Sequence, residues 1–203
     1  MTPRPLITVI IPTIGRPTLM QTLDSLAEQR LAQYLEVLVF PDVHRRDVPQ
    51  PPELDNYRCF RRLIWQPVDG GYSAWGHPQR NVGLEMANGM WVCSLDDDDV
   101  WSSTAMDAII GAVSQEAEGM HIFRMRYPDG QLLWASRTAT FGNVGTPMMV
   151  WRNDPTLVGR WGKRYEGDYD FLKESVHRLP NGLDSLHWHE AIIAEIKPTL
   201  VPA

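Results

Sequence analysis

Four consecutive aspartates, Asp96, Asp97, Asp98 and Asp99, directly follow the apolar run Met90–Leu95. All four are ionised at neutral pH, because the pKa of a free aspartate is about 4. Like charges at the end of a buried strand are costly unless a cation neutralises them, and Mg²⁺ or Mn²⁺ prefers such oxygen ligands. A strand would direct Asp96 and Asp98 to one side and Asp97 and Asp99 to the other. One alternating pair could therefore hold a metal that also binds a diphosphate.

A second interpretation of the same run is a solvated acidic turn that caps the next helix, because Asp favours helix starts. Two neighbouring features favour a ligand site. An apolar strand precedes the run, and the helix start Trp101–Thr104 follows it. Ligand sites in open α/β sheets lie at the carboxyl ends of strands, which is where the aspartates would stand.

The elements that must position this run begin with a βαβ pattern. Leu6–Ile11 is almost wholly apolar and predicts a strand buried on both faces. Residues 18–30 carry leucines at helical spacing, and residues 36–40 predict a second buried strand. We expect further elements in the first half at 62–66 (strand), 78–88 (helix), 90–95 (strand) and 103–118 (helix). This order is typical of an α/β domain with a mostly parallel central sheet flanked by helices.

The second half has a different pattern. A Pro-Asp-Gly turn at 128–130 predicts a hairpin of 121–126 with 131–135. A strand is expected at 147–152, a helix from Gly167 to about His177, and a strand at 190–197. No linker interrupts the chain, so we expect one domain over residues 1–203 whose second half is mixed and rich in aromatic residues.

Composition excludes several classes of function. The 203 residues carry a net charge of −6, which indicates no general affinity for nucleic acid or anionic membranes. Cys59 and Cys93 form no metal-ligand spacing and no disulfide framework, and Cys93 is expected in the core. No signal peptide or bilayer-spanning stretch is visible. A cytoplasmic protein is the expectation, and peripheral attachment to a membrane stays open.

Several short motifs, taken in their order along the chain, resemble those of the family 2 glycosyltransferases of the GT-A fold. The similarity covers about Leu6 to Leu172 and rests on the order and spacing of short motifs. These are the strand Ile7–Thr13, the helix end Ser25–Gln29, Gln79–Leu84, Ala87–Gly89, Leu95–Asp99 and Gly167–Phe171. The resemblance implies a Rossmann-like GT-A domain, with a nucleotide-sugar-binding half at about 1–100 and an acceptor-binding half at about 101–203.

The resemblance implies an inverting, metal-dependent transfer of a sugar from a nucleotide-diphosphate donor to an acceptor hydroxyl. The donor is expected to be a UDP-sugar, the acceptor a saccharide and the metal Mn²⁺ or Mg²⁺. Asp98 is the expected main metal ligand, and Asp96 contacts the metal or the donor's ribose. Asp97 and Asp99 are expected to be structural, with helix capping as one such role. Asp97 is also among the expected nucleotide-binding residues.

The expected catalytic base is Asp168, which matches the family's later acidic motif. Asp168 could instead be only the N-cap of the helix that follows it, and Asp170 is the weaker candidate for the base. A late histidine can serve as an extra metal ligand in some such enzymes. We therefore keep His187 and His189 as metal ligands beside the alternative of ordinary surface or core histidines.

The nucleotide pocket is expected at the ends of the first two strands, where Pro12, Thr13, Arg16 and Asp42 lie. Arg80 is expected to contact the diphosphate or the base, with a solvated surface charge as the alternative. Sugars stack their C–H faces on aromatic rings, so one or two tryptophans should line the acceptor groove while most are core. The tryptophans considered are Trp75, Trp101, Trp151, Trp161 and Trp188.

The chain departs from the family pattern at two places. Phe40–His44 stands where the family usually has Asp-Asp-Gly-Ser, so only Asp42 is kept, and Gly167 replaces a glutamate although Glu166 precedes it. The glycine-rich residues 69–76 predict a mobile loop, of which 72–76 should order when donor binds.

Two other functions are alternatives to sugar transfer. A nucleotidyltransferase that makes nucleotide sugars would carry a longer Gly-rich basic loop than Pro12–Arg16. A non-catalytic sugar- or metal-binding protein would have lost carboxylates, but Asp96, Asp98 and Asp168 are all present.

Overall fold

The computed structural model describes residues 4–44, 48–71 and 75–196. In these residues a nine-stranded mixed sheet has the strand order β3-β2-β1-β4-β8-β6-β9-β5, with β7 paired to β6. The strands are β1 (Ile7–Thr13), β2 (Leu35–Pro41), β3 (Arg62–Trp65), β4 (Trp91–Ser94), β5 (Asp99–Trp101), β6 (Met120–Arg126), β7 (Leu132–Leu133), β8 (Met149–Arg152) and β9 (Leu186–Ile196). The α-helices are α1 (Leu19–Ala27), α2 (His77–Met86), α3 (Ala105–Gln115) and α4 (Gly167–Arg178), and short 3₁₀ turns lie at Ala32–Tyr34, Pro52–Asn56, Thr146–Met148 and Gly182–Ser185.

The first half of the sheet is parallel. β1 pairs in parallel with β2 on one side and β4 on the other, and β3 extends the sheet beyond β2. Every residue of β1 and β2 is buried, as their continuous apolar sequences predicted. The strand order reverses between β1 and β4, so the carboxyl ends of these two strands form the crevice where open α/β sheets bind ligands.

Strand β1 continues through Pro12 to Thr13, two residues beyond the predicted end. Pro12 lies opposite Phe40 of β2, whereas the pairing of β1 with β4 stops at Ile10. Beyond Ile10 the strand therefore has a sheet partner on one side only. A proline that cannot donate a hydrogen bond is tolerated at such an edge position.

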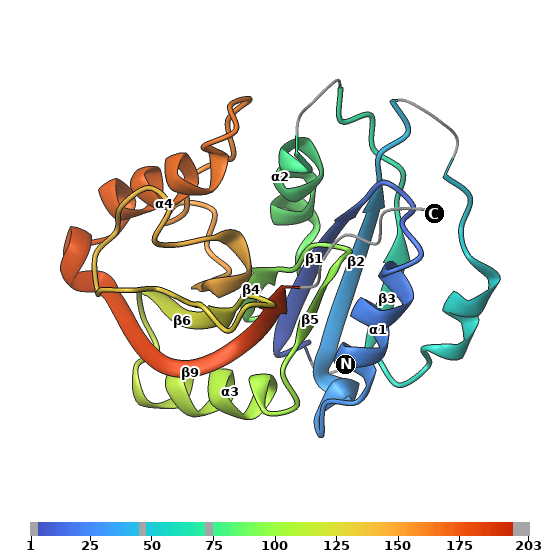
Figure 1. Ribbon diagram of the computed structural model, residues 1–203, viewed down its shortest axis with the longest axis horizontal. Coiled ribbons are helices and arrows are strands. Elements are labelled where there is room, and N and C mark those ends of the chain that lie inside the picture. Colours follow the sequence, from blue (N-terminus) through green and yellow to red (C-terminus); the bar gives the residue numbers. More distant parts are fainter. Residues whose placement is uncertain (1–3, 45–47, 72–74, 197–203) are drawn as a thin grey trace.

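The second half of the sheet is mixed, as expected. β8 runs antiparallel to both β4 and β6, β9 runs parallel to β6, and β5 closes the edge antiparallel to β9. The predicted hairpin is present as β6 and β7, which pair antiparallel. Figure 1 shows the long curved strand β9 sweeping beneath β6, with α3 and α4 on opposite sides of these strands. The α/β architecture predicted from the sequence is confirmed.

Two elements differ from the prediction. The short strand β5 was not expected, because residues 99–101 were assigned to the acidic run and the start of a helix. Strand β9 begins at Leu186, four residues before the predicted start, and so includes both late histidines. Both differences involve β9, which pairs with β6 along one edge and with β5 along the other.

A buried carboxylate joins several elements at the amino ends of the parallel strands. Glu36 of β2 accepts hydrogen bonds from Thr8 Oγ1 at 2.7 Å, Asn88 N at 2.7 Å and Arg62 Nη1 at 2.9 Å. Burial would raise the pKa of Glu36, but these donors outweigh it and the pKa is lowered. Glu36 therefore stays charged inside an otherwise apolar strand and ties β1, β3 and the α2–β4 turn to β2.

Within the described residues, no helix combines the length and the apolar character that crossing a membrane requires.

Candidate active site

The acidic run forms a turn at the carboxyl end of β4. The backbone N–H of Asp99 donates to the carbonyl of Asp96 at 3.1 Å, and Leu95 N still donates to Ile10 O of β1 at 3.0 Å. The run therefore begins just after β4, which ends at Ser94. The expected separation of Asp96 and Asp98 from Asp97 is present, because the first two line one cavity and Asp97 does not, but Asp99 departs from the predicted alternation. Asp99 belongs to β5 and lines the same cavity as Asp96 and Asp98, so it does not cap the next helix, which begins at Ala105.

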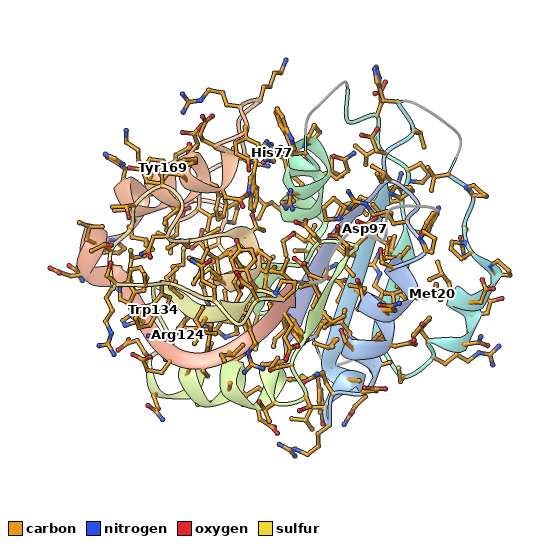
Figure 2. All side chains as sticks on the ribbon, in the orientation of Figure 1. Met20, His77, Asp97, Arg124, Trp134 and Tyr169 are labelled. Atoms are coloured by element: carbon orange, nitrogen blue, oxygen red, sulfur yellow. The ribbon has the colours of Figure 1, made fainter. Side chains whose placement is uncertain are left out.

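Asp97 points away from its neighbours and into the first βα loop. Its carboxylate accepts from Thr13 Oγ1 at 2.5 Å, Ile14 N at 3.2 Å and Arg16 Nη1 at 2.6 Å, and its side chain is 2% exposed. Figure 2 shows Asp97 beside the upper ends of β1 and β2. These contacts agree with the structural role that the sequence suggested: Asp97 fixes the loop that follows β1 against the acidic turn.

Asp96 faces a buried guanidinium. Arg80 of α2 is 3% exposed; its Nη2 donates to Asp96 Oδ1, and its Nη1 donates to Trp75 O at 2.7 Å. Partial desolvation at the cavity wall raises the pKa of Asp96 above its usual range, with Arg80 opposing the rise and the carboxylates of Asp168, Asp97 and Asp98 adding to it. Arg80 is thus not the solvated surface charge of the alternative interpretation. It is a fixed cation that holds one wall of the site.

One cavity brings the two halves of the chain together. Its volume is about 420 Å³, within the range of small-molecule sites, and Asp96, Asp98, Arg80 and Asp168 line it. The first three residues come from the carboxyl end of β4 and from α2, and Asp168 comes from the start of α4, about 70 residues later in the chain. The cavity therefore combines the acidic turn with the expected base.

Two hydrogen bonds orient the Asp168 carboxylate. Trp161 Nε1 donates to its Oδ1 at 3.2 Å, and the backbone N–H of Thr146 donates to its Oδ2 at 3.0 Å. The N-cap position of α4 belongs to Glu166, whose side chain makes no capping bond. Asp168 lies in the first helical turn instead, so the geometry does not support the simple N-cap interpretation.

The glycine that departs from the family pattern has a steric reason. A Cβ on Gly167 would lie 2.7 Å from both His77 Nδ1 and His77 Nε2, so the ring of His77 occupies the space of a side chain. The Gly162 carbonyl can only accept, so His77 Nδ1 carries a proton and donates to it at 2.7 Å. Burial, with Arg80 nearby, lowers the pKa of His77. The neutral ring of His77 therefore packs α2 against the start of α4 (Figure 2).

The remaining residues predicted for the nucleotide pocket lie beside this cavity rather than in its lining. Thr13 and Arg16 reach the acidic turn through Asp97. Asp42 N donates to Thr13 O at 2.8 Å, and Asp42 Oδ1 accepts from Gly70 N at 3.2 Å. Together with Pro12 they form the ends of β1 and β2 next to the acidic turn. Of the glycine-rich loop, residues 72–74 lie outside the described residues.

His187 and His189 do not join the acidic turn, and their assignment as metal ligands is not supported by their position. They lie at the start of β9, where His189 Nε2 and His121 Nδ1 are 2.9 Å apart. The His121 ring packs edge-on against Trp91, at the amino end of β4, whereas the acidic turn follows its carboxyl end. Ile196 is the β9 residue that lines the cavity, and it lies seven positions after His189 along an extended strand, which is roughly 20 Å.

Asp96 and Asp98 could hold a divalent metal only if other groups complete its ligand shell. Within the described part of the chain, no three His, Cys, Asp or Glu side chains are grouped closely enough to hold a metal ion. The side chains of Asp96 and Asp98 are 40% and 17% exposed, so both carboxylates are accessible from the cavity. Mg²⁺ typically takes one or two carboxylates and completes its shell with water and substrate phosphates. The donor set matches that pattern.

Several residues of the cavity were missed by sequence reasoning. Tyr127, Phe141, Tyr165 and Tyr169 line it, but of the tryptophans considered only Trp75 does. Trp161 supports Asp168 from behind, and Trp101 and Trp151 are buried in the core. Tyr169 belongs to the motif Gly167–Phe171, although the motif gave it no role. Tyr127, Phe141 and Tyr165 lie in loops without a motif, so the number of aromatic residues was the only available signal for them.

Comparisons with known proteins agree with this geometry. The family model for glycosyl transferase family 2 matches residues 8–173. No curated protein matches the chain significantly. The structure of S. aureus TarS 1–349 in complex with UDP-GlcNAc is similar with a TM-score of 0.71 and 16% identity, covering 97% of this chain and 60% of that one. The same TarS fragment in complex with UDP gives 0.70 and 18% identity, covering 95% and 60%.

The mannosyltransferase PcManGT from Pyrobaculum calidifontis, in complex with GDP-Man and Mn²⁺, gives a TM-score of 0.65 and 15% identity, covering 98% of this chain and 58% of that one. The chain thus spans about three fifths of the length of these structures, and 37% of a longer TarS structure. These likenesses establish the GT-A fold. Because the family model covers most of the sequence, the chain belongs to glycosyl transferase family 2.

Proposed function

We propose that this protein transfers a sugar from a nucleotide-diphosphate donor to an acceptor hydroxyl, in one inverting and metal-dependent displacement. Residues up to about 100 would bind the donor, and the following residues would bind the acceptor, within a single domain. The observation that carries the proposal is the shared cavity, in which Asp96 and Asp98 of the first half face Asp168 of the second.

The acidic turn is the proposed donor side. Asp98, with Asp96, would hold Mn²⁺ or Mg²⁺, which supplies Lewis-acid stabilisation of the diphosphate that leaves. Arg80 orients Asp96 and adds a fixed positive charge beside it. Asp97 keeps the loop after β1 in place, so that Thr13 and Arg16 can bound the nucleotide pocket together with Pro12 and Asp42.

Asp168 is the proposed general base. Each of its oxygens accepts one hydrogen bond, from Trp161 and Thr146, and a carboxylate has lone pairs left to accept the proton of an acceptor hydroxyl. The deprotonated oxygen would then attack the anomeric carbon as the bond to the diphosphate breaks. A single displacement without an enzyme nucleophile inverts the anomeric configuration.

A UDP-sugar is the first donor to test, and GDP-mannose is the second. Two structural neighbours hold UDP or UDP-GlcNAc, and the third holds GDP-Man with Mn²⁺. Thermal shift with a panel of nucleotide sugars and Mn²⁺ should identify the donor, because a ligand that binds only the folded state raises the melting temperature.

Nucleotide release in the presence of the selected donor then separates the alternatives. Sugar transfer releases a nucleoside diphosphate and gives a product of inverted anomeric configuration. A nucleotidyltransferase would instead catalyse pyrophosphate exchange into the nucleotide sugar. A non-catalytic binding protein would show a higher melting temperature when the donor is added but would release no nucleotide. Either of these last two results would overturn the proposal.

A further inference from the structure

Three aromatic side chains in the lining of the active-site cavity are largely exposed. Trp75 is 50% exposed, Phe141 is 59% exposed and Tyr165 is 68% exposed. Exposed apolar surface that gathers at one place on a protein marks a site of interaction. The aromatic rings stand in the same cavity as Asp168, so whatever they contact would also be in reach of the proposed base.

A contact from the active site holds the backbone of Trp75 in place. Trp75 has a positive φ of 47°, which side chains other than glycine rarely adopt, and Gly76 follows with φ 75°. Arg80 Nη1 donates to the Trp75 carbonyl at 2.7 Å, so the residue that holds Asp96 also fixes this backbone. Unfavourable backbone conformations persist where the surroundings impose them, and they cluster at ligand sites.

The exposed rings form edge-to-face pairs. Trp75 and Tyr165 lie at right angles with ring centroids 5.6 Å apart, and Phe141 makes a similar contact with Tyr169 at 6.3 Å. Tyr165 directly precedes Glu166, and Asp168 follows two residues later at the start of α4. The Trp75–Tyr165 pair thus connects the α2 side of the cavity to the helix that carries the proposed base.

Aromatic surface beside carboxylates suits a saccharide. A sugar ring offers a C–H face that packs against the electron-rich face of an aromatic ring, and its hydroxyls need hydrogen-bond acceptors such as Asp168 and Glu166. An alkyl chain would cover these carboxylates and shield them from water without donating any hydrogen bond, which is costly. A nucleic acid would be repelled by them. The chemistry of the lining therefore selects a sugar among hydroxyl-bearing molecules.

We propose that Trp75 and Tyr165 form an acceptor subsite that binds a saccharide ring and presents one hydroxyl to Asp168. This inference rests on the proposed function for the identity of the reaction, but the subsite itself is a binding site that can be tested without turnover. It makes Trp75 and Tyr165 residues that determine acceptor specificity.

Saturation-transfer difference NMR with methyl glycosides of glucose, galactose, mannose and N-acetylglucosamine tests the subsite, with UDP and Mn²⁺ present. At least one glycoside should show saturation of its ring C–H protons with the unaltered protein. Trp75→Ala and Tyr165→Ala should each reduce that signal at least fivefold, and Trp75→Phe should restore much of it. Tyr34→Ala is the matched control, because Tyr34 is an exposed aromatic residue outside the cavity lining.

Three results would overturn the subsite: no glycoside binds, both alanine variants keep the full signal, or 1-octanol binds in place of the sugars. A glycoside held in the donor's sugar position would keep its signal in both variants. Circular dichroism checks that each variant is folded, and the two variants remove rings from different elements. UDP binding is measured in the same samples. If the glycoside signal depends on the two rings but UDP does not bind, the result would count against the proposed function and leave the subsite standing.

Discussion

Adjacent aspartates of the acidic turn have different surroundings. Asp97 is buried and accepts three hydrogen bonds from the loop after β1, whereas Asp98 opens onto the cavity. The sequence shows four identical side chains, and only the turn geometry separates an anchor from a candidate ligand. Residue types therefore located the site, while the role of each carboxylate depended on backbone directions that a run of identical residues does not encode.

The contrast between Asp98 and Asp97 gives the first prediction. Asp98→Ala should abolish Mn²⁺-dependent UDP or GDP binding and leave the stability nearly unchanged, because its ion pair with the partly exposed Arg16 at 3.2 Å contributes little to folding. Asp97→Asn should lower the free energy of unfolding by about 2–3 kcal/mol, because an amide cannot accept all the hydrogen bonds of a buried carboxylate. Titration calorimetry and urea unfolding measure the two effects. Unchanged nucleotide and metal affinity in Asp98→Ala would remove Asp98 from the metal site.

Asp168→Asn is the second prediction. Donor binding should stay nearly intact, and turnover should fall by about a hundredfold to ten-thousandfold, the usual contribution of a general base. Asn substitutes well for Asp in a purely capping role, so the substitution separates catalysis from helix stabilisation. Initial rates with a working donor and acceptor are the measurement. A near wild-type rate would redirect attention to Asp170 or Glu166.

At the scale of elements, the start of α4 shows what local patterns can and cannot predict. The helix was predicted from Gly167 to about His177 and spans Gly167–Arg178, because its boundary signals are local. Strand β5 was missed because three residues carry no periodicity, and its partner β9 lies about 95 residues away. The contact that explains Gly167 is equally remote, since His77 belongs to α2.

The packing of His77 on Gly167 gives the third prediction. Gly167→Ala should cost about 1–3 kcal/mol of stability, because the added methyl group overpacks the contact between α2 and α4. It should also lower turnover more than donor binding, since the neighbouring residue is Asp168. His77→Ala makes room for the methyl group, so the double variant should be at least about 1 kcal/mol more stable than the sum of the single effects predicts. Urea unfolding of the unaltered protein, the two single variants and the double variant measures this coupling. Strictly additive losses of stability would show that the two residues do not compete for space.

At the scale of the whole molecule, the sequence predicted the order of most elements and the approximate place of the site, but not which distant residues meet there. A motif at a strand end indicated the acidic turn, and a separate motif at a helix start indicated Asp168. Their meeting in one cavity depends on β8, β6 and β9 continuing the sheet beyond β4. The same topology carries His187 and His189 to the opposite end of β4, a displacement that sequence spacing does not reveal.

The imidazole cluster of His121, His187 and His189 gives a pH prediction. Burial and the two neighbouring histidines lower the pKa of His121 to about 3, and burial also lowers that of His189. The unfolded chain takes up protons below about pH 6.5 that the folded protein cannot, so stability is full above that pH and falls as the pH drops toward 3. His121 alone should account for a loss of about 2 kcal/mol between pH 6.5 and 5.

Urea unfolding of the unaltered protein and of His121→Gln at several pH values between 7.5 and 5 measures this dependence. The variant should be less stable at pH 7.5 but should lose less stability on acidification. Equal losses in the two proteins would mean that His121 does not control the acid sensitivity of the fold.

The central claim is that the acidic turn and Asp168 enclose one metal-dependent sugar-transfer site, and locating the metal tests it most directly. Crystals grown with UDP or GDP and Mn²⁺ should give an anomalous Mn²⁺ peak about 2.1 Å from a carboxylate oxygen of Asp98, with the diphosphate on the cavity side of the ion. The nucleotide should lie toward Thr13 and Asp42, and Asp168 should face the open end of the diphosphate. A Mn²⁺ peak remote from Asp96 and Asp98, or a nucleotide bound away from this cavity, would contradict the account.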